Sequence, residues 1–252
     1  MELNEIALCI VTYNPTEKQK KNIETLKDRF GGFFLFDNSF ENLGLAVRYN
    51  QALKKAEEKG FKYLLLLDQD SYVLEKELDK FISCISKTEN QNILIYSFSL
   101  KQTDSCAYKY NIVPISSGSL VNVKKALEIG GFNEELFIDE VDHEFALRGF
   151  EKGYQTVRVG AYLSHRIGEK KRILFFKHSC YPPARYYYMI RNFLYLKKKY
   201  KHPFVEKRTN YMVFFMIKSL LFCKNRLEIV KMIRKGINDF KNNLMGKQVE
   251  IS

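Results

Sequence analysis

The stretch Tyr63–Ser71, YLLLLDQDS, decides the fold. Four leucines run directly into two aspartates, Asp68 and Asp70, which are separated by a single residue. A continuous apolar run of this length after a helix-like segment predicts a buried strand of a parallel sheet. Ligands bind at the carboxyl ends of such strands in open α/β sheets. Two carboxylates are costly to hold together there unless a cation joins them, so we expect a divalent cation that carries a diphosphate. On its own, an Asp-x-Asp pair also fits a helix N-cap or a turn.

The segments around this run alternate between strand and helix patterns. Strands are expected at 6–13, 33–36, 63–68 and 93–98, with helices at 16–29, 43–59 and 75–87 between them. After residue 100 the alternation becomes irregular, with strands expected at 107–115, 119–123, 155–159 and 162–165 and helices at 124–129 and 139–152. The pattern predicts an α/β fold, with a mostly parallel sheet flanked by helices. Three further helices are expected at 184–200, 204–223 and 226–243, as a C-terminal helical appendage.

The charge of the chain is concentrated at its end. Residues 1–165 hold 20 Lys and Arg against 24 Asp and Glu, whereas residues 166–252 hold 21 against 5. We therefore expect a mildly acidic domain over residues 1–180 and a basic, aromatic-rich helical region over residues 181–252. A net charge of +16 in the later part indicates a polyanionic partner, either nucleic acid or an anionic lipid surface.

The cysteines and the apolar stretches bear on the compartment. The five cysteines are scattered and form no C-x-x-C pair, which favours buried thiols in a reducing compartment over disulfides or a zinc site. The first residues fit a strand rather than a signal peptide. The most apolar late stretch, residues 211–223, is shorter than the roughly 20 residues that span a bilayer and contains Lys218. A transmembrane helix is therefore not expected.

Polar residues also follow the second expected strand. Asp37 closes this strand, Asn42 directly precedes the helix expected at 43–59, and Gly44 lies at the start of that helix. A carboxylate at this position can accept hydrogen bonds from a nucleotide base or a ribose hydroxyl. Gly44 permits close backbone approach at a helix start, where free N–H groups favour phosphate. Ordinary turn chemistry is the alternative explanation of this segment.

A group of acids begins a later helix. Asp139, Glu140, Asp142 and Glu144 lie within six residues, and a carboxylate that faces a crevice from a helix start can serve as a general base. A solvated first helical turn that complements the helix dipole is the alternative. His165 ends an expected strand and could reach a metal or a diphosphate if that strand joins the same sheet, although a lone histidine also fits a polar strand end.

Together these motifs resemble glycosyltransferase family 2, whose members have the nucleotide-diphospho-sugar transferase fold called GT-A. Within that family the chain looks most like bacterial dTDP-rhamnosyltransferases of polysaccharide and O-antigen (lipopolysaccharide) synthesis. The resemblance covers roughly residues 5–200, and no single motif is decisive. Its carriers, in order, are IVTYNP (10–15), DNS (37–39), NLGLA (42–46), LDQDS (67–71), SSGS (116–119), GGFNEELF (130–137), VDHEFALR (141–148), GY (153–154) and His165.

The resemblance implies a role for each matching residue. It implies that Asp142 is the catalytic base, although Val141 replaces the acid that usually precedes the base, so Asp139 is a second candidate. It implies metal ligation by Asp70, with Asp68 and His165 beside it, and a Mg²⁺ or Mn²⁺ cofactor. The nucleotide-sugar-binding residues that it implies are Thr12, Tyr13, Asn14, Asp37, Asn42, Gly44, Asp68, Gly118, Glu144, Arg148 and Arg191.

The implied activity is that of an inverting hexosyltransferase in the EC 2.4 class. The expected reaction moves a sugar, L-rhamnose from dTDP-rhamnose, onto a saccharide acceptor that is lipid-linked. A UDP-hexose transferase specific for galactose, glucose or N-acetylglucosamine is the alternative.

The expected location is cytoplasmic and peripheral on the inner face of the cell membrane, with the basic helices on anionic lipid. Packing of these helices on the body of the protein is the alternative to membrane contact. A nucleic-acid-binding protein and a catalytically inactive membrane adaptor are further alternatives; the acidic body argues against the first, and no nucleic-acid partner is expected.

Overall fold

The computed structural model describes residues 1–252 except 89–91, 104, 166–170, 174–175 and 252. The chain divides into two compact units. The first, here called the sheet unit, comprises Met1–Asn133 and Asp142–His165, and the second, here called the helical unit, comprises Glu134–Val141 and Arg166–Ser252. The short segment that precedes Asp142 in the sequence therefore belongs to the helical unit, although Asp142 itself belongs to the sheet unit.

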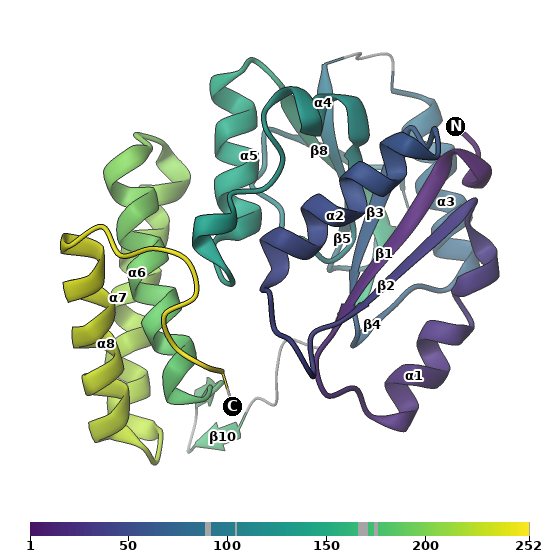
Figure 1. Ribbon diagram of the computed structural model, residues 1–252. Coiled ribbons are helices and arrows are strands. Elements are labelled where there is room, and N and C mark those ends of the chain that lie inside the picture. Colours follow the sequence, from purple (N-terminus) through teal and green to yellow (C-terminus); the bar gives the residue numbers. More distant parts are fainter. Residues whose placement is uncertain (89–91, 104, 166–170, 174–175, 252) are drawn as a thin grey trace. The chain divides into compact units, whose positions relative to one another are not determined.

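The sheet unit contains a mixed, mostly parallel sheet with the strand order β2-β1-β3-β7-β5-β8-β6 among the described residues (Figure 1). The strands are β1 (Ile6–Thr12), β2 (Gly32–Asp37), β3 (Tyr63–Asp68), β5 (Ile93–Ser99), β6 (Tyr108–Tyr110), β7 (Ser119–Asn122) and β8 (Gln155–Tyr162). Strands β2, β1 and β3 are parallel, as are β5 and β8, whereas β7 and β6 are antiparallel to their neighbours. The predicted α/β class and flanking helices are confirmed.

The register brings the carboxyl ends of the first three strands to one edge. Thr12 pairs with Asp37 across β1 and β2, and Val11 pairs with Asp68 across β1 and β3. Leu64, Leu65, Leu66 and Leu67 are each at most 1% exposed, so the apolar run of β3 is buried on both faces of the sheet. The first polar side chains after the core therefore meet at the same end of the sheet, as expected of neighbouring parallel strands.

Helices cover both sides of this sheet. They are α1 (Glu17–Glu24), α2 (Leu45–Glu58), α3 (Glu75–Ser86), α4 (Val123–Glu128) and α5 (Val141–Glu151). Alternate residues of β1, namely Ile6, Leu8 and Ile10, share one core cluster with Phe81 of α3 and Ile23 of α1. Helix α2 lies in front of the sheet in Figure 1 and buries its own apolar stripe. Because successive side chains of a strand point to opposite faces of the sheet, each strand contributes residues to the packing on both faces.

Short elements complete the description of the chain. Within the described residues, 3-10 helices lie at Leu3–Glu5, Lys27–Arg29 and Glu134–Leu136. Two small antiparallel ladders pair β4 (Ser71–Tyr72) with β9 (Ser164–His165) and β10 (Lys171–Ile173) with β11 (Phe176–His178). The first ladder pairs His165 with Ser71, the residue that follows Asp70.

The helical unit contains α6 (Pro183–Lys199), α7 (Pro203–Phe222) and α8 (Arg226–Lys241), so the three predicted C-terminal helices are present. Helices α6 and α8 approach closely at Gly236, where a Cβ atom would lie 2.7 Å from the carbonyl oxygen of Tyr187. Met212 and Met216 of α7 and Ile229 of α8 share one apolar cluster with α6. No helix in the described part of the chain is both long and apolar enough to cross a membrane.

The cysteines differ from the prediction of buried thiols. Cys84 and Cys106 form a disulfide in the sheet unit, and Cys180 and Cys223 form one in the helical unit, while Cys9 is a buried free thiol. The prediction was wrong for four of the five residues. The spacing of the cysteines in the sequence does not show which of them the tertiary fold brings together. In the structure, the Cα–Cα distance is 5.6 Å in the first pair and 5.8 Å in the second, as disulfide geometry requires.

Candidate active site

Three potential metal ligands meet at the carboxyl end of β3. Ligand atoms of Asp68, Asp70 and His165 lie within 4.8 Å of one another. His165 Nε2 is 3.9 Å from Asp68 Oδ2, and Nδ1 is 3.7 Å from Asp70 Oδ1. The carboxylate side chains are 37% and 32% exposed, so a ligand can reach them from solvent. The structure thus brings together the three residues predicted to hold a metal.

Two serines hold the imidazole of this cluster. Ser71 Oγ lies 2.8 Å from His165 Nδ1 and 2.6 Å from Ser117 Oγ, which in turn accepts the backbone N–H of Asp68 at 3.0 Å. With a proton on Nδ1 donated to Ser71, Nε2 of His165 carries the free lone pair that a metal needs. Such secondary contacts orient ligands in metal sites. Neither serine was among the predicted site residues, although Ser71 lies directly after the Asp-x-Asp pair.

The chemistry of this cluster fits a divalent cation. Two carboxylates and one imidazole are oxygen and nitrogen donors, which suit Mn²⁺ or Mg²⁺ better than a soft metal. Both carboxylates are partly exposed, so a bound cation would remain within reach of phosphate oxygens from solvent. The side chains present therefore fit the predicted cofactor class.

The ends of β1 and β2 form a polar pair beside this cluster. Asp37 Oδ1 accepts hydrogen bonds from Ser39 N at 2.9 Å, Ser39 Oγ at 2.5 Å and Thr12 Oγ1 at 3.3 Å. The bonds from Ser39 are the main cause that lowers the pKa of Asp37 below its usual value. Asn14 N donates to Ser39 Oγ at 2.8 Å, so Thr12, Asn14 and Asp37 belong to one network. Asp37 is exposed and ionised, as an acceptor for a base or ribose must be.

Gln69 is a residue of this edge that the sequence reasoning missed. Its side-chain amide accepts the backbone N–H of Tyr13 at 2.7 Å and donates to the Tyr13 carbonyl at 3.2 Å. The residue between the two aspartates therefore fixes the backbone of a residue predicted to line the nucleotide pocket. The sequence signal for this contact is the position of Gln69 in the turn that directly follows β3, at the carboxyl end of the strand next to β1.

The loop before α2 is also built from side-chain-to-backbone hydrogen bonds. Asn42 Oδ1 accepts Gly44 N at 3.0 Å, and Gly44 has a φ of 84°, which favours glycine. Asn38 is buried, with its Oδ1 accepting Arg48 Nε at 2.8 Å. Asn42 thus shapes the turn, and Gly44 caps the start of α2, where the prediction places a phosphate.

Asp142 lies in the first turn of α5 with a defined orientation. Its Oδ2 accepts Ser116 N at 2.9 Å, and its Oδ1 accepts His143 N at 2.9 Å. The side chain is 20% exposed. The fully buried Tyr49 hydrogen-bonds Ser116, and burial raises the pKa of Tyr49 well above its usual value, so its hydroxyl stays neutral. Each oxygen of Asp142 keeps one more acceptor position for a ligand hydroxyl.

Glu144 and Arg148 form a buried ion pair. Arg148 Nε and Nη2 reach Glu144 Oε2 at 3.3 and 2.9 Å, and Glu144 is 0% exposed. Arg148 also donates to the carbonyls of Ile129 and Gly131. The ion pair therefore fixes the turn at residues 130–132, in which Gly131 has a φ of 68°. The role of both residues as nucleotide-sugar ligands remains a prediction. In the structure, the pair stabilises the turn at Ile129 and Gly131.

Gly118 lies at the turn into β7. Its φ is 81°, and a Cβ atom there would lie 2.6 Å from Leu163 Cδ2. Only glycine fits both constraints at low cost. The glycine therefore permits the turn that carries Ser117 to the metal-ligand cluster, while its predicted contact with the nucleotide sugar stays a prediction.

Asp139 and Arg191 belong to the helical unit. Asp139 is paired with Arg185, whose Nε and Nη2 lie 3.2 and 3.0 Å from its carboxylate oxygens. Asp139 and Glu140 have positive φ values of 59° and 63°, which is rare for residues other than glycine. Arg191 is fully buried and donates to the carbonyls of Glu135 and Gly246. It supports the segment that leads to Asp142, and its predicted role with the nucleotide sugar stays a prediction.

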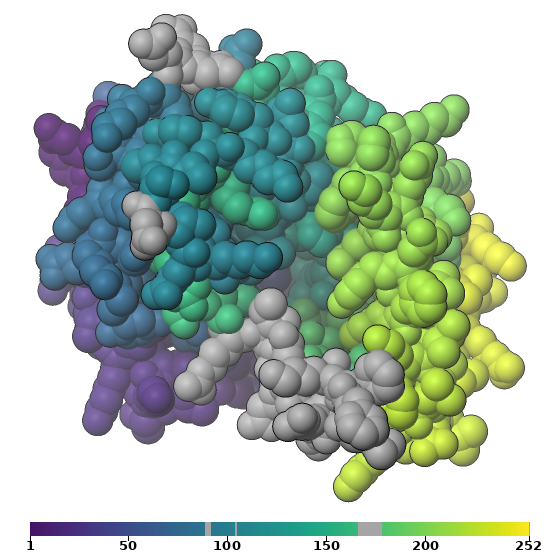
Figure 2. Space-filling view, turned by 180° about the vertical axis from the view of Figure 1, so that it is seen from behind, coloured from purple at the N-terminus to yellow at the C-terminus, as the bar shows by residue number. Residues whose placement is uncertain are grey.

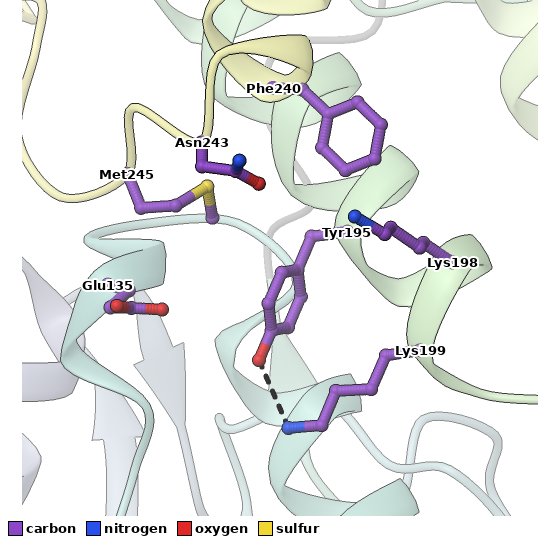
Figure 3. A pocket seen from close by; sticks show the side chains of 7 residues that line it. All are labelled: Glu135, Tyr195, Lys198, Lys199, Phe240, Asn243 and Met245. Atoms are coloured by element: carbon purple, nitrogen blue, oxygen red, sulfur yellow. Dashed lines mark hydrogen bonds between the residues drawn. The ribbon is translucent and has the colours of Figure 1, made fainter.

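A separate cavity of 460 Å³ lies within the helical unit (Figure 3). In Figure 3, the Tyr195 hydroxyl and the Lys199 ammonium group point toward each other, 3.0 Å apart. The residues that line it are Glu135, Tyr195, Lys198, Lys199, Phe240, Asn243 and Met245. None of the predicted nucleotide-sugar or metal residues is in this lining.

Comparison with known proteins gives a consistent result. No family model matches the chain. The chain is 29% identical to the dTDP-rhamnosyl transferase RfbF of Shigella flexneri over 276 aligned positions, which cover 90% of this chain and 92% of the relative. The aligned region extends through both units, so the similarity is not confined to the sheet.

Solved structures with a similar fold are also glycosyltransferases. Residues 1–349 of S. aureus TarS in complex with UDP-GlcNAc align with a TM-score of 0.50 and 12% identity, covering 97% of this chain and 82% of that one. GalNAc-T7 with UDP, GalNAc and Mn²⁺ aligns with a TM-score of 0.50 and 13% identity, covering 95% and 56%. The sheet topology and these structural matches show the GT-A fold, and the sequence similarity to a rhamnosyl transferase identifies the chain as a glycosyltransferase.

Proposed function

We propose that the chain is an inverting family 2 glycosyltransferase that moves L-rhamnose from dTDP-rhamnose onto a saccharide acceptor for O-antigen or a related polysaccharide. The single observation that carries the choice of sugar is the similarity to a dTDP-rhamnosyl transferase over 90% of the chain. The cluster of Asp68, Asp70 and His165 supports a diphosphate-linked donor. A UDP-hexose donor is the competing proposal, which the fold shared with the UDP-GlcNAc complex of TarS keeps open.

The donor half of the proposed mechanism uses the ends of β1, β2 and β3. Asp37 accepts hydrogen bonds from the nucleoside, and Gln69 keeps the backbone at Tyr13 in place beside it. Asp68, Asp70 and His165 would hold Mg²⁺ or Mn²⁺, which supplies positive charge to the diphosphate leaving group. Ser71 and Ser117 keep the imidazole oriented before the donor binds.

The acceptor half uses Asp142. Its carboxylate takes the proton of the acceptor hydroxyl while the hydroxyl oxygen attacks the anomeric carbon from the side opposite the diphosphate. The bonds from Ser116 N and His143 N fix the carboxylate and leave acceptor positions on both oxygens. Asp139 is the weaker candidate for the base, because Arg185 already occupies its carboxylate.

The donor is tested with purified protein and a set of nucleotide sugars in the presence of Mn²⁺ or Mg²⁺. We expect dTDP-rhamnose to raise the thermal midpoint most, because a ligand that binds only the folded state stabilises it. Release of dTDP with a saccharide acceptor would complete the test. A larger shift with UDP-galactose, UDP-glucose or UDP-N-acetylglucosamine would replace rhamnose by that sugar.

The second part of the proposal is peripheral binding to an anionic membrane, with a lipid-linked acceptor. Helix α7 exposes an apolar stripe with helical spacing, and Phe214 and Leu221 of this stripe are 64% and 58% exposed. Figure 2 shows the yellow-green side chains of this part of the chain on the viewed face. Phe215, Leu220 and Phe222 of the same helix are instead partly buried. An exposed apolar stripe on a basic helical unit is typical of helices that lie in a bilayer interface.

Liposome flotation tests this part. Phe214→Ser combined with Leu221→Ser should lower the bound fraction on anionic vesicles, because it removes the two most exposed apolar side chains of α7. Phe40→Ser is the matched control, because Phe40 is 97% exposed but lies in the sheet unit. Equal flotation of both variants and of the unaltered chain would exclude α7 as the membrane contact.

A further inference from the structure

A second cluster of potential metal ligands lies in the helical unit, apart from the proposed active-site residues. His178, Cys180 and Cys223 each offer a ligand atom, and these atoms lie within 4.8 Å of one another. His178 and Cys223 are buried, with 5% and 3% exposure, and Cys180 is partly exposed. His178 ends β11, Cys180 follows it, and Cys223 directly follows α7, so the cluster joins two parts of the unit.

The hydrogen-bond network assigns the proton of His178. Ser219 Oγ donates its only hydrogen to the Phe215 carbonyl at 2.8 Å. In its contact with His178 Nε2 at 3.0 Å, the hydroxyl oxygen must therefore accept, and Nε2 carries the proton. A neutral imidazole with a proton on Nε2 has a bare Nδ1, which is the form that binds a metal.

We propose that His178, Cys180 and Cys223 bind Zn²⁺ when the disulfide between the two cysteines is reduced. Two thiolates and one imidazole are the donors that zinc prefers. A water molecule completes a tetrahedral set on the side of Cys180, which is open to solvent. The hydroxyl of Tyr186, 3.6 Å from Cys223 Sγ, supports that sulfur with a hydrogen bond.

The disulfide and the metal are mutually exclusive. A thiol reductant supplies two electrons and two protons to the Cys180–Cys223 disulfide, which becomes two thiols while the reductant becomes a disulfide. Zinc binding then releases both thiol protons. In a reducing compartment, where disulfides are rare, the zinc form would replace the disulfide as the link between the start of α6 and the end of α7.

The test uses the intact chain, reduced with a phosphine that does not compete for the metal, and titrated with Co²⁺ as a spectroscopic substitute for Zn²⁺. We expect a thiolate-to-cobalt charge-transfer absorption that saturates at one equivalent and is abolished by Zn²⁺. The oxidised chain should show no such band. This comparison needs no variant, and absence of the band in the reduced chain would overturn the proposal.

Variants locate the ligands. Cys180→Ser and His178→Gln should each weaken Co²⁺ binding by at least about tenfold, as loss of a ligand or its support does in other metal sites. The matched control is the double variant Cys84→Ser with Cys106→Ser, which removes the other disulfide and should keep the band. A band that is lost in this control, or unchanged in His178→Gln, would also overturn the assignment. Because Asp68, Asp70 and His165 contain no sulfur, cation binding there gives no charge-transfer band.

Discussion

Gln69 holds both polar atoms of the Tyr13 backbone, with its Oε1 2.7 Å from Tyr13 N and its Nε2 3.2 Å from Tyr13 O. This contact joins the end of β1 to the turn between Asp68 and Asp70. The same short segment therefore carries two candidate metal ligands, Asp68 and Asp70, and the residue that supports the backbone of the predicted nucleotide pocket.

Gln69→Ala should weaken donor binding without unfolding the protein. It removes the two hydrogen bonds from the Gln69 side chain to the Tyr13 backbone, and each such hydrogen bond contributes about 0.5–1.5 kcal/mol. We expect the KM for the donor to rise roughly tenfold. Gln102→Ala is the control, because Gln102 is exposed. Equal KM values for the two variants would contradict the role of this contact.

Asp70→Ala should remove metal-dependent nucleotide binding. The variant removes one carboxylate from the cluster of Asp68, Asp70 and His165, whose ligand atoms lie within 4.8 Å of one another. Isothermal titration with the nucleotide diphosphate, with and without EDTA, measures the effect. We expect the unaltered chain to lose affinity in EDTA and the variant to be weak in both conditions. Asp79→Asn, on an exposed position of α3, serves as the control. Affinity that does not depend on EDTA in the unaltered chain would exclude a metal role.

Asp142→Asn and Asp139→Asn should separate the two candidates for the base. The first keeps the shape and the acceptor for one backbone N–H but removes the proton acceptor, so kcat should fall by about 10²–10⁴-fold while donor binding is retained. The second breaks the pair with Arg185 and should lower kcat less. Single-turnover transfer rates decide between them. A larger loss for Asp139→Asn would reverse the assignment.

Asp239 gives a pH-dependent contribution to stability. Burial acts to raise its pKa, but hydrogen bonds from Lys235 and Tyr187 outweigh burial, so the pKa lies below its ordinary value near 3.8. The stabilisation is therefore complete above about pH 4 and is lost as the pH falls through the lower, folded-state pKa. Asp239→Asn should cost about 1–3 kcal/mol at pH 7.

The corresponding measurement is the thermal midpoint between pH 3 and 7. The difference between the unaltered chain and Asp239→Asn should shrink below pH 4 and be constant above pH 5. Asp79→Asn again provides the exposed control. A difference that stays constant across the whole range would show that the charge of Asp239 does not contribute.

Glu144→Gln should destabilise the sheet unit. Glu144 is 0% exposed and pairs with Arg148, and removing one partner of a buried pair costs about 3–5 kcal/mol. Urea unfolding measures the loss. Glu17→Gln is the control, because the Glu17–Lys20 pair is exposed and such pairs contribute about 0–1 kcal/mol. A loss of similar size in the two variants would mean that Glu144 is not an essential partner.

Much of the sheet unit was predictable because local patterns carry it. The leucine run predicted β3 with its observed bounds, Tyr63–Asp68, and the helix expected at 43–59 corresponds to α2 at Leu45–Glu58. The order of strands was not predictable in full. Strand β7 lies antiparallel between β3 and β5, and it pairs with residues of β3 that are more than fifty positions away in the sequence.

Predictions from sequence were weaker wherever a residue acts through distant partners. Arg191 is a buried support for the segment before Asp142, because it donates to carbonyls of Glu135 and Gly246 that lie more than fifty positions away. The cysteine pairs were missed for the same reason, since 22 and 43 positions separate their members. Spacing along the chain does not encode such contacts.

The sequence alone determined which chemical groups the candidate site offers. An apolar run must be buried, and the acids that follow it must lie where the buried strand reaches solvent, so Asp68 and Asp70 were placed by hydrophobicity and strand geometry. Only the tertiary structure decided what stands beside them. The antiparallel pairing of Ser71 with His165 brings together residues 94 positions apart, and that pairing completes the ligand cluster. Contacts of this range depend on how the whole chain packs.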